Sequence, residues 1–134
     1  MISVLSNIQD DICNYADAIS GITGTDVEII DESLMRIAGT GKYRHMLNEN
    51  VAKNGYIYRH VLQVRETVLI KNPGEHPLCQ LCEKNRYCSE MLDLNAPIFL
   101  NNRVIGVIGI ICSTQAQRDT LLSQIDKFVT FIEQ

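Results

Sequence analysis

The sequence lacks a block of basic residues. Its 12 lysines and arginines stand against 16 aspartates and glutamates, which gives a formal net charge of −4. Nucleic-acid-binding modules need a basic face that displaces the counterions of the phosphates. We therefore expect no direct nucleic-acid partner.

Segments that enter a membrane or direct secretion are also lacking. The longest apolar run, from Val104 to Cys112, is far shorter than the roughly 20 residues that cross a bilayer. The first residues show no positive segment followed by an apolar one, which a secretory signal requires. We expect no membrane partner and a cytoplasmic location.

A nucleotide-binding loop is lacking as well. Gly39-Thr-Gly-Lys42 is not a Walker A motif, which needs glycine where Arg36 stands and serine or threonine where Tyr43 stands. The 134 residues, 46% of them hydrophobic, have the size and composition of one domain with one core.

Two amphipathic helices are predicted, one at each end of the chain. Their apolar residues recur at alternating spacings of three and four, a heptad-like pattern narrower than the stripe of an ordinary surface helix. Gly21 and Gly24 are expected to end the first helix, and Thr114-Gln-Ala-Gln117 is a capping-box pattern that opens the second. Either the helices pair between two copies of the chain, or each packs on its own sheet. The apolar positions are Leu5, Ile8, Ile12, Tyr15, Ile19 and Ile22 in the first helix and Leu121, Ile125, Phe128 and Ile132 in the second.

About five strands are predicted between these helices. Turn residues at 31–33 and at Asn101-Asn102 indicate two hairpins, and hence an antiparallel sheet. Residues 103–112 are apolar at alternate positions on both faces, which predicts a central strand covered on both sides. The fold class is α+β. The expected strands are 26–30, 34–38, 67–70, 97–100 and 103–112, and further helices are expected at 56–64 and 89–94.

Three of the five cysteines form a C-x2-C-x5-C pattern, namely Cys79, Cys82 and Cys88. A C-x2-C turn presents two thiolates to one metal ion, and Cys88 supplies a third. His76 is the nearest candidate for a fourth ligand, while Cys13 and Cys112 are remote in sequence. This pattern fits zinc, an iron–sulfur cluster, a thiol/disulfide switch, or cysteines with no special role.

Tyrosines gather between the first hairpin and the third strand. Tyr43, Tyr56 and Tyr58, with His60 beside them, are candidates for the lining of a ligand pocket in a sheet-based sensor. The alternative is that these side chains belong to the core or its rim.

Several short motifs occur in a recognisable order. These are Asp26-Val-Glu-Ile-Ile-Asp31, Arg36-Ile-Ala-Gly-Thr-Gly41, Asn72-Pro-Gly-Glu-His76 leading into the cysteines, Ala96-Pro-Ile98 and Val104-Ile-Gly-Val-Ile-Gly109. Together they resemble the N-terminal GAF/PAS-like sensory domain of bacterial sigma-54-dependent transcriptional activators. Relatives of this kind often carry a further cysteine shortly before the Pro-Ile pair, where this chain reads Asp93-Leu-Asn-Ala96. This departure argues against a four-cysteine cluster and favours His76 or an exogenous fourth ligand.

The resemblance implies a fold, a set of partners and a function. Residues 1–134 are expected to form one sensory domain, cut from a longer regulator, with N- and C-terminal helices packed on an antiparallel sheet. The parent chain would continue with an AAA+ ATPase and a DNA-binding domain. A homodimer through the terminal helices and a small-molecule ligand are expected.

Three functions remain open at this point. The first is a signal-input domain that senses a small molecule or redox state through the pocket and a cysteine-held zinc or iron–sulfur site. The second is an interaction or dimerisation module pinned by zinc. The third is a thiol enzyme like the GAF-type methionine sulfoxide reductases, which would need two of the three clustered cysteines. No general acid is evident beside them, so we expect no enzymatic activity.

Overall fold

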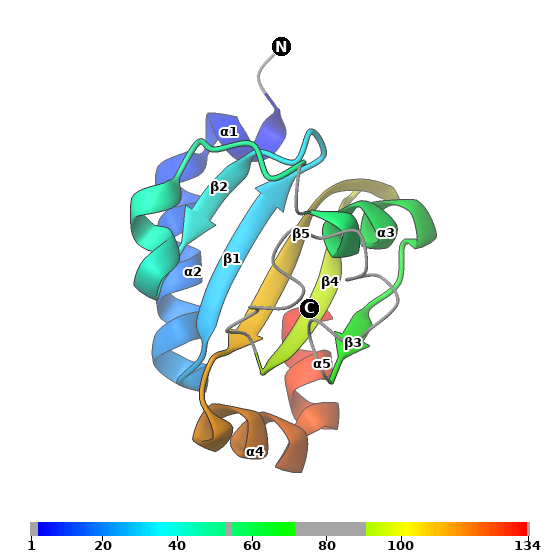
Figure 1. Cartoon of the computed structure of the whole chain (residues 1–134). Helices are drawn as coiled ribbons and strands as arrows, with labels where there is room; N and C mark the ends of the chain where they lie inside the picture. The colour runs from blue at the N-terminus through cyan, green and yellow to red at the C-terminus, as the bar shows by residue number, and fades with distance from the viewer. Residues whose placement is uncertain (1–2, 53–54, 72–90, 134) are drawn as a thin grey trace.

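The computed structural model describes residues 3–52, 55–71 and 91–133. It contains a five-stranded antiparallel sheet in the order β2-β1-β5-β4-β3 (Figure 1). The predicted α+β class is therefore confirmed. The strands are β1 (Asp26–Asp31), β2 (Arg36–Gly39), β3 (Val68–Ile70), β4 (Leu92–Leu100) and β5 (Arg103–Cys112). The helices are α1 (Val4–Asn7), α2 (Gln9–Thr23), α3 (Tyr56–Val64), α4 (Gln115–Ser123) and α5 (Ile125–Glu133), with a 3-10 helix, η1 (Gly41–Met46).

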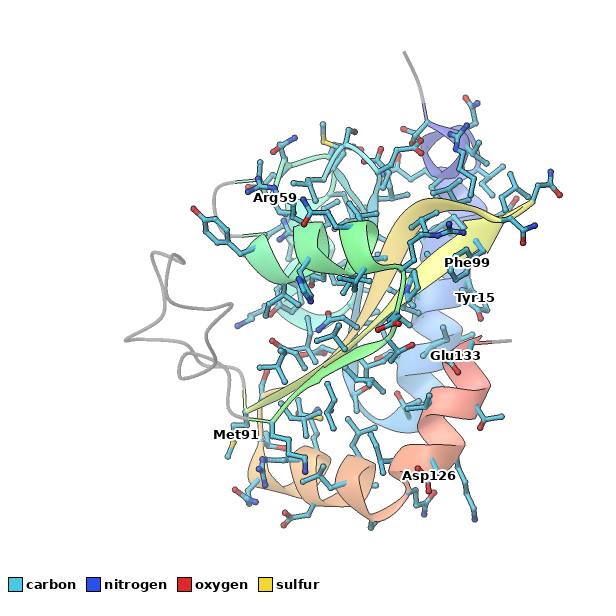
Figure 2. All side chains as sticks on the ribbon, turned by 90° about the vertical axis from the view of Figure 1, so that its right-hand side faces the viewer. Tyr15, Arg59, Met91, Phe99, Asp126 and Glu133 are labelled. Atoms are coloured by element: carbon cyan, nitrogen blue, oxygen red, sulfur yellow. The ribbon has the colours of Figure 1, made fainter. Side chains whose placement is uncertain are left out.

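The sheet lies between two layers. Helices α2 and α5 cover one face and α3 covers the other (Figure 2). The α2 face carries the larger apolar cluster, and the α3 face carries a smaller one around Ile30, Val61 and Val107. None of the described helices is long and apolar enough to cross a membrane.

Strand β5 lies at the centre of the sheet, as predicted. It pairs with β1 on one edge and with β4 on the other, and both of its faces are buried. Its two glycines face opposite layers. A Cβ atom on Gly106 would meet the Leu5 side chain of α1 at 2.6 Å, and one on Gly109 would meet the Tyr58 hydroxyl of α3 at 3.0 Å. The missing side chains therefore let a helix approach each face of the strand.

One predicted helix is wrong: residues 92–94, expected to be helical, belong to strand β4. The alternation of Leu92, Leu94 and Ala96 toward the α2 layer fixes this strand, because all three are buried in the apolar cluster there. Asp93 and Asn95 disfavour strands by intrinsic propensity. Tertiary packing overrides that preference here.

The two terminal helices each divide into two. The first breaks at Ile8 and the last at Gln124, so four helices replace the two expected. Gly24 ends α2 in the left-handed conformation at φ 73°, whereas Gly21 lies inside the helix. The capping box at Thr114 is confirmed.

The heptad-like pattern of the first helical segment divides between two faces. Leu5 and Ile19 are buried, and Ile12 packs against the same cluster on the sheet. Three residues seven apart lie along one flank of this buried face and remain exposed: Ile8 at 44%, Tyr15 at 51% and Ile22 at 72%. We call these three residues the α2 stripe.

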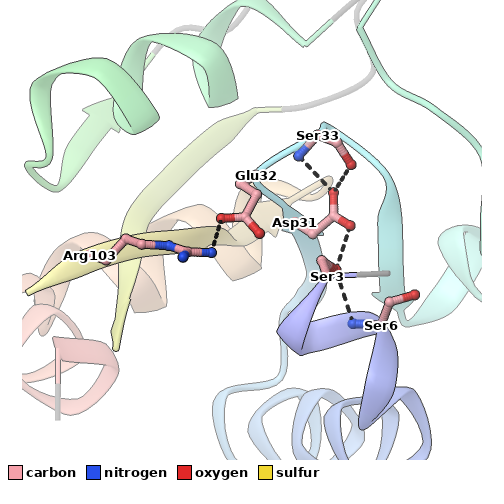
Figure 3. Close-up of polar contacts among 6 residues, drawn as sticks. All are labelled: Ser3, Ser6, Asp31, Glu32, Ser33 and Arg103. Carbon is pink, nitrogen blue, oxygen red and sulfur yellow. Dashed lines mark hydrogen bonds and ion pairs between the residues drawn. The ribbon is translucent and has the colours of Figure 1, made fainter. Parts of the chain in front are cut away.

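A buried carboxylate joins the N-terminal helix to the first hairpin (Figure 3). Asp31 Oδ2 accepts a hydrogen bond from the Ser3 hydroxyl at 2.8 Å, and Ser3 in turn caps α1. Asp31 Oδ1 accepts from the Ser33 amide at 2.9 Å, the Ser33 hydroxyl at 2.8 Å and the Met35 amide at 3.0 Å. Burial by itself raises the pKa of this carboxyl, but the hydrogen bonds from Met35, Ser3 and Ser33 together lower it below its ordinary 3.8.

We expect the substitution Asp31→Ala to lower the free energy of unfolding at pH 7 by about 3 kcal/mol, because buried donors lose a charged acceptor. The lowered pKa stabilises the folded state above about pH 4, and this contribution disappears as pH falls through the folded pKa. Urea denaturation at pH 7 and pH 3 measures both effects. The difference between wild type and variant should be smaller at pH 3.

Glu32→Ala provides the matched control. Glu32 lies beside Asp31 and forms a surface ion pair with Arg103 at 3.1 Å, a contact worth less than about 1 kcal/mol. Equal losses of stability in the two variants would contradict the role given to Asp31.

Candidate functional site

The predicted metal ligands Cys79, Cys82, Cys88 and His76 lie outside the described residues. Among the residues that the structure does describe, no group of three histidine, cysteine or acidic side chains is arranged to hold a metal ion. The metal hypothesis for segment 72–90 therefore stays a prediction.

The two remaining cysteines lie on the α2 side of the sheet. Burial raises the pKa of the Cys112 thiol to about 11, with a further contribution from the Asp93 carboxylate. Burial also raises the pKa of the Cys13 thiol, and Asp17 and Asp10 add to the rise. Both thiols are therefore protonated at neutral pH, unlike the thiolates that bind metals.

One row of directly opposed residues crosses all five strands on the α3 face of the sheet. Backbone pairing places Gly39 opposite Glu28, Glu28 opposite Gly109, Gly109 opposite Asn95, and Asn95 opposite Val68. Paired residues in a sheet point to the same face. We call this set the cross-strand row.

Each glycine of the row is covered by one of the tyrosines proposed from the sequence as pocket-lining residues. A Cβ atom on Gly39 would meet the Tyr43 Cβ at 2.6 Å, and one on Gly109 would meet the Tyr58 hydroxyl at 3.0 Å. The structure therefore brings Tyr43 and Tyr58 to the same row of the sheet, from η1 and from α3.

The other two predicted pocket residues lie elsewhere on α3. Tyr56 and His60 are four residues apart, so they share one face of the helix. Tyr58, two residues from each, lies about 200° around the helix from them and packs on the sheet with Val61 and Leu62. The Tyr56 ring lies 5.5 Å from the guanidinium of Arg59.

A buried ion pair occupies the β1–β2 end of the row. Arg36 Nε donates to Glu28 Oε2 at 3.1 Å, and the two side chains are only 11% and 4% exposed. The same guanidinium donates to the Met46 carbonyl at 3.0 Å and lies 5.7 Å from the Tyr43 ring centre. These contacts hold η1 against the sheet.

Two polar side chains from β4 occupy the other half of the α3 face. Asn95 is 1% exposed and Asp93 is 4% exposed. Their alternation with the apolar Leu92, Leu94 and Ala96 places both on the α3 face. Asn95 Nδ2 is a buried donor that has no hydrogen-bond partner among the residues that the structure describes. The α3 face therefore contains two buried polar side chains of β4, and the Asn95 amide retains an unused donor.

Sequence reasoning missed Glu28, Arg36, Asp93 and Asn95. The sequence feature that could have identified them is the alternation of polar and apolar residues along a strand. Glu28 lies between Val27 and Ile29, and Asn95 lies between Leu94 and Ala96. A polar residue in a strand normally marks a solvent-facing side. Only the packing around the sheet shows that Glu28, Asp93 and Asn95 are buried and that Arg36 is largely covered.

The C-terminal helices hold the strands that flank the cysteine-bearing segment. Arg118 of α4 donates from Nε to the Met91 carbonyl at 3.2 Å and from Nη2 to the Lys71 carbonyl at 3.4 Å. Lys71 follows β3 and Met91 precedes β4, so these residues flank segment 72–90. The Thr67 hydroxyl donates to Glu133 of α5 at 2.6 Å. Helices α4 and α5 therefore contact the chain on both sides of β3.

A comparison with known sequences finds a regulator. Over 130 residues, 97% of this chain, the sequence is 32% identical to a protein of Escherichia coli strain K12 described as a candidate uric acid sigma-54-dependent transcriptional regulator, UacR. The matched part is 22% of that protein, so the chain spans about a fifth of its relative's length. No protein-family model matches the chain.

Comparison with solved structures finds GAF domains. The GAF domain of A. aeolicus nlh2 in an inactive state aligns with a TM-score of 0.62 at 18% identity, covering 90% of this chain and 78% of that one. The Geobacter sulfurreducens GAF domain/HD domain protein gives 0.62 at 16% identity, covering 87% and 88%. A type II free methionine-R-sulfoxide reductase from Thermoplasma acidophilum gives 0.61 at 13% identity, covering 87% and 85%. The chain has the GAF fold and, over nearly all of its length, is similar to part of a sigma-54-dependent transcriptional regulator, as its motifs predicted.

Proposed function

We propose that the chain is the signal-input domain of a sigma-54-dependent transcriptional regulator and that it binds a small molecule on the α3 face of its sheet. The observation that carries this proposal is the buried Asn95 amide, whose Nδ2 has no hydrogen-bond partner. The domain catalyses no reaction. It acts in the cytoplasm on the AAA+ ATPase and DNA-binding domains of a longer parent chain.

The contacts of Arg118 support a route for the signal. A guanidinium that binds the Lys71 and Met91 carbonyls couples the spacing of these two residues to the position of α4. A change in segment 72–90 or on the sheet face would then alter how α4 and α5 pack. Such a shift between two packings is an ordinary form of allosteric transmission.

The cysteine-bearing segment enters the proposal as a second sensing element. Cys79, Cys82 and Cys88, with His76 as a candidate fourth ligand, would hold an iron–sulfur cluster or zinc. Metal analysis and electronic spectroscopy of anaerobically purified protein distinguish these two. Stoichiometric zinc without any small-molecule binding would favour an interaction module, and reduction of free methionine sulfoxide would favour a thiol enzyme.

The α2 stripe supports a homodimer. Ile8, Tyr15 and Ile22 are apolar, exposed and seven residues apart, which is the spacing of a helix seam that pairs with a second helix. Two copies related by a two-fold axis would bury this stripe against itself.

The name of the Escherichia coli relative makes uric acid the first ligand to test. We expect uric acid to raise the melting temperature of the purified domain, because a ligand that binds only the folded state adds about 2.7 kcal/mol of stability at 100 times its Kd. Differential scanning calorimetry measures the shift. Tyr58→Ala removes a side chain of α3 that packs on the sheet and should reduce the shift in melting temperature. Tyr15→Ala, on the α2 stripe, should leave this shift unchanged.

A melting temperature that no concentration of uric acid changes would remove uric acid as the signal. An equal response in both tyrosine variants would contradict binding on the α3 face.

We expect Tyr15→Glu to weaken the homodimer by about tenfold or more in Kd, because a charge would be buried at the centre of the interface. Sedimentation equilibrium of wild type and variant measures the two constants. Asp11→Lys, a charge change on the exposed surface of the same helix, is the control and should have a much smaller effect. Wild-type protein that is monomeric at high concentration would refute the dimer.

A further inference from the structure

We infer that Asn95 recognises the signal molecule and that it binds an amide edge, meaning a carbonyl acceptor and an N–H donor side by side on a ring. This inference deepens the proposed function and rests on it, because it names the chemical class of ligand for the α3 face.

The first argument is the state of the Asn95 side chain. The residue is 1% exposed, and its Nδ2 atom is buried without a hydrogen-bond partner. Leaving such a donor unsatisfied is costly, and native proteins satisfy the great majority of them. A polar molecule bound against the sheet would supply the missing acceptor.

The second argument is that Asn95 serves the fold poorly. It lies in the middle of β4, between pairs with Gly109 on β5 and Val68 on β3. Asparagine disfavours strands, and an apolar side chain here would pack against the α3 layer without any unmet donor. A residue that has low strand propensity and also leaves a buried donor unsatisfied fits a binding role better than a structural one.

The third argument concerns what an asparagine amide complements. It carries donors and an acceptor on neighbouring atoms, so its natural partner offers an acceptor beside a donor. The same complementarity underlies the bidentate contact of asparagine with the edge of adenine. A ring with a –NH–C(=O)– edge has this geometry.

The groups nearest the amide include a second polar side chain. A Cβ atom on Gly109 would lie 3.1 Å from Asn95 Oδ1 and 3.0 Å from the Tyr58 hydroxyl. The absence of a side chain at Gly109 therefore leaves room for both polar groups on the same side of β5. The Tyr58 hydroxyl and the Asp93 carboxylate border the same part of the α3 face and add polar groups for the rest of the ring.

The experiment compares matched pairs of small probes. Ligand-observed NMR or calorimetry would measure the binding of 2-pyridone and uracil, which have the amide edge, against N-methyl-2-pyridone and 1,3-dimethyluracil, which keep the carbonyl but lose the N–H. We expect the unmethylated member of each pair to bind the wild-type domain about tenfold more tightly, since one hydrogen bond of about 1.4 kcal/mol corresponds to that factor.

Two variants connect this preference to Asn95. Asn95→Leu should abolish the preference and raise the melting temperature of the ligand-free domain by about 2–6 °C, because an unsatisfied buried polar group is removed. Asn95→Asp, nearly the same shape without the Nδ2 donor, keeps an oxygen that accepts the N–H of the ligand. It should therefore keep the preference but weaken the binding of all four probes through their carbonyl, and it serves if the leucine variant fails to fold.

A lower melting temperature or an unchanged preference in Asn95→Leu, or probe binding that is not weakened in Asn95→Asp, would overturn the inference. So would equal binding of both members of each pair. Binding of uric acid that persists unchanged in Asn95→Leu would refute the role of Asn95 but leave the proposed function standing. Failure of every probe and of uric acid to bind would refute the inference and remove uric acid as the ligand.

Discussion

The fold depends on the packing of helices against both faces of one central strand. Strand β5 pairs on both edges and is buried on both faces. Gly106 admits the Leu5 side chain of α1 on one side, and Gly109 admits Tyr58 of α3 on the other. Any side chain at Gly106 would also meet the Ile30 carbonyl of β1. Two glycines three residues apart thus allow a three-layer arrangement around a single strand.

The two faces of the sheet differ in chemistry, and the proposed function places ligand binding on one face and dimerisation on the other. The α2 layer closes over the larger apolar cluster and carries the α2 stripe. The α3 layer covers the cross-strand row, with the Glu28–Arg36 ion pair and the Asn95 amide. Apolar packing supplies most of the stability, so polar residues are tolerated on the α3 face. The contacts of Arg118 then connect the residues flanking segment 72–90 to the C-terminal helices.

The sequence predicts this fold well where periodicity and turn chemistry agree. Both hairpins, the capping box at Thr114 and the central position of β5 follow from local patterns, and Asn101 and Asn102 adopt the positive φ expected of them. The start of β4 was missed, because Asp93 and Asn95 mask the alternation of the leucines. The same two residues are the ones that make the α3 face polar. Local propensity fails at the position to which we assign a binding role, as expected where function opposes the local preference.

The central claim is that this domain transmits a change at its sensing elements to α4 and α5. Amide hydrogen exchange over residues 115–133 tests it most directly, in protein purified anaerobically with its native metal content and again after treatment with a chelator and an oxidant. We expect exchange in α4 and α5 to change between these states in the wild type and to change little in Arg118→Ala, which lacks the contacts to Lys71 and Met91. A change confined to segment 72–90 in both proteins would contradict this account.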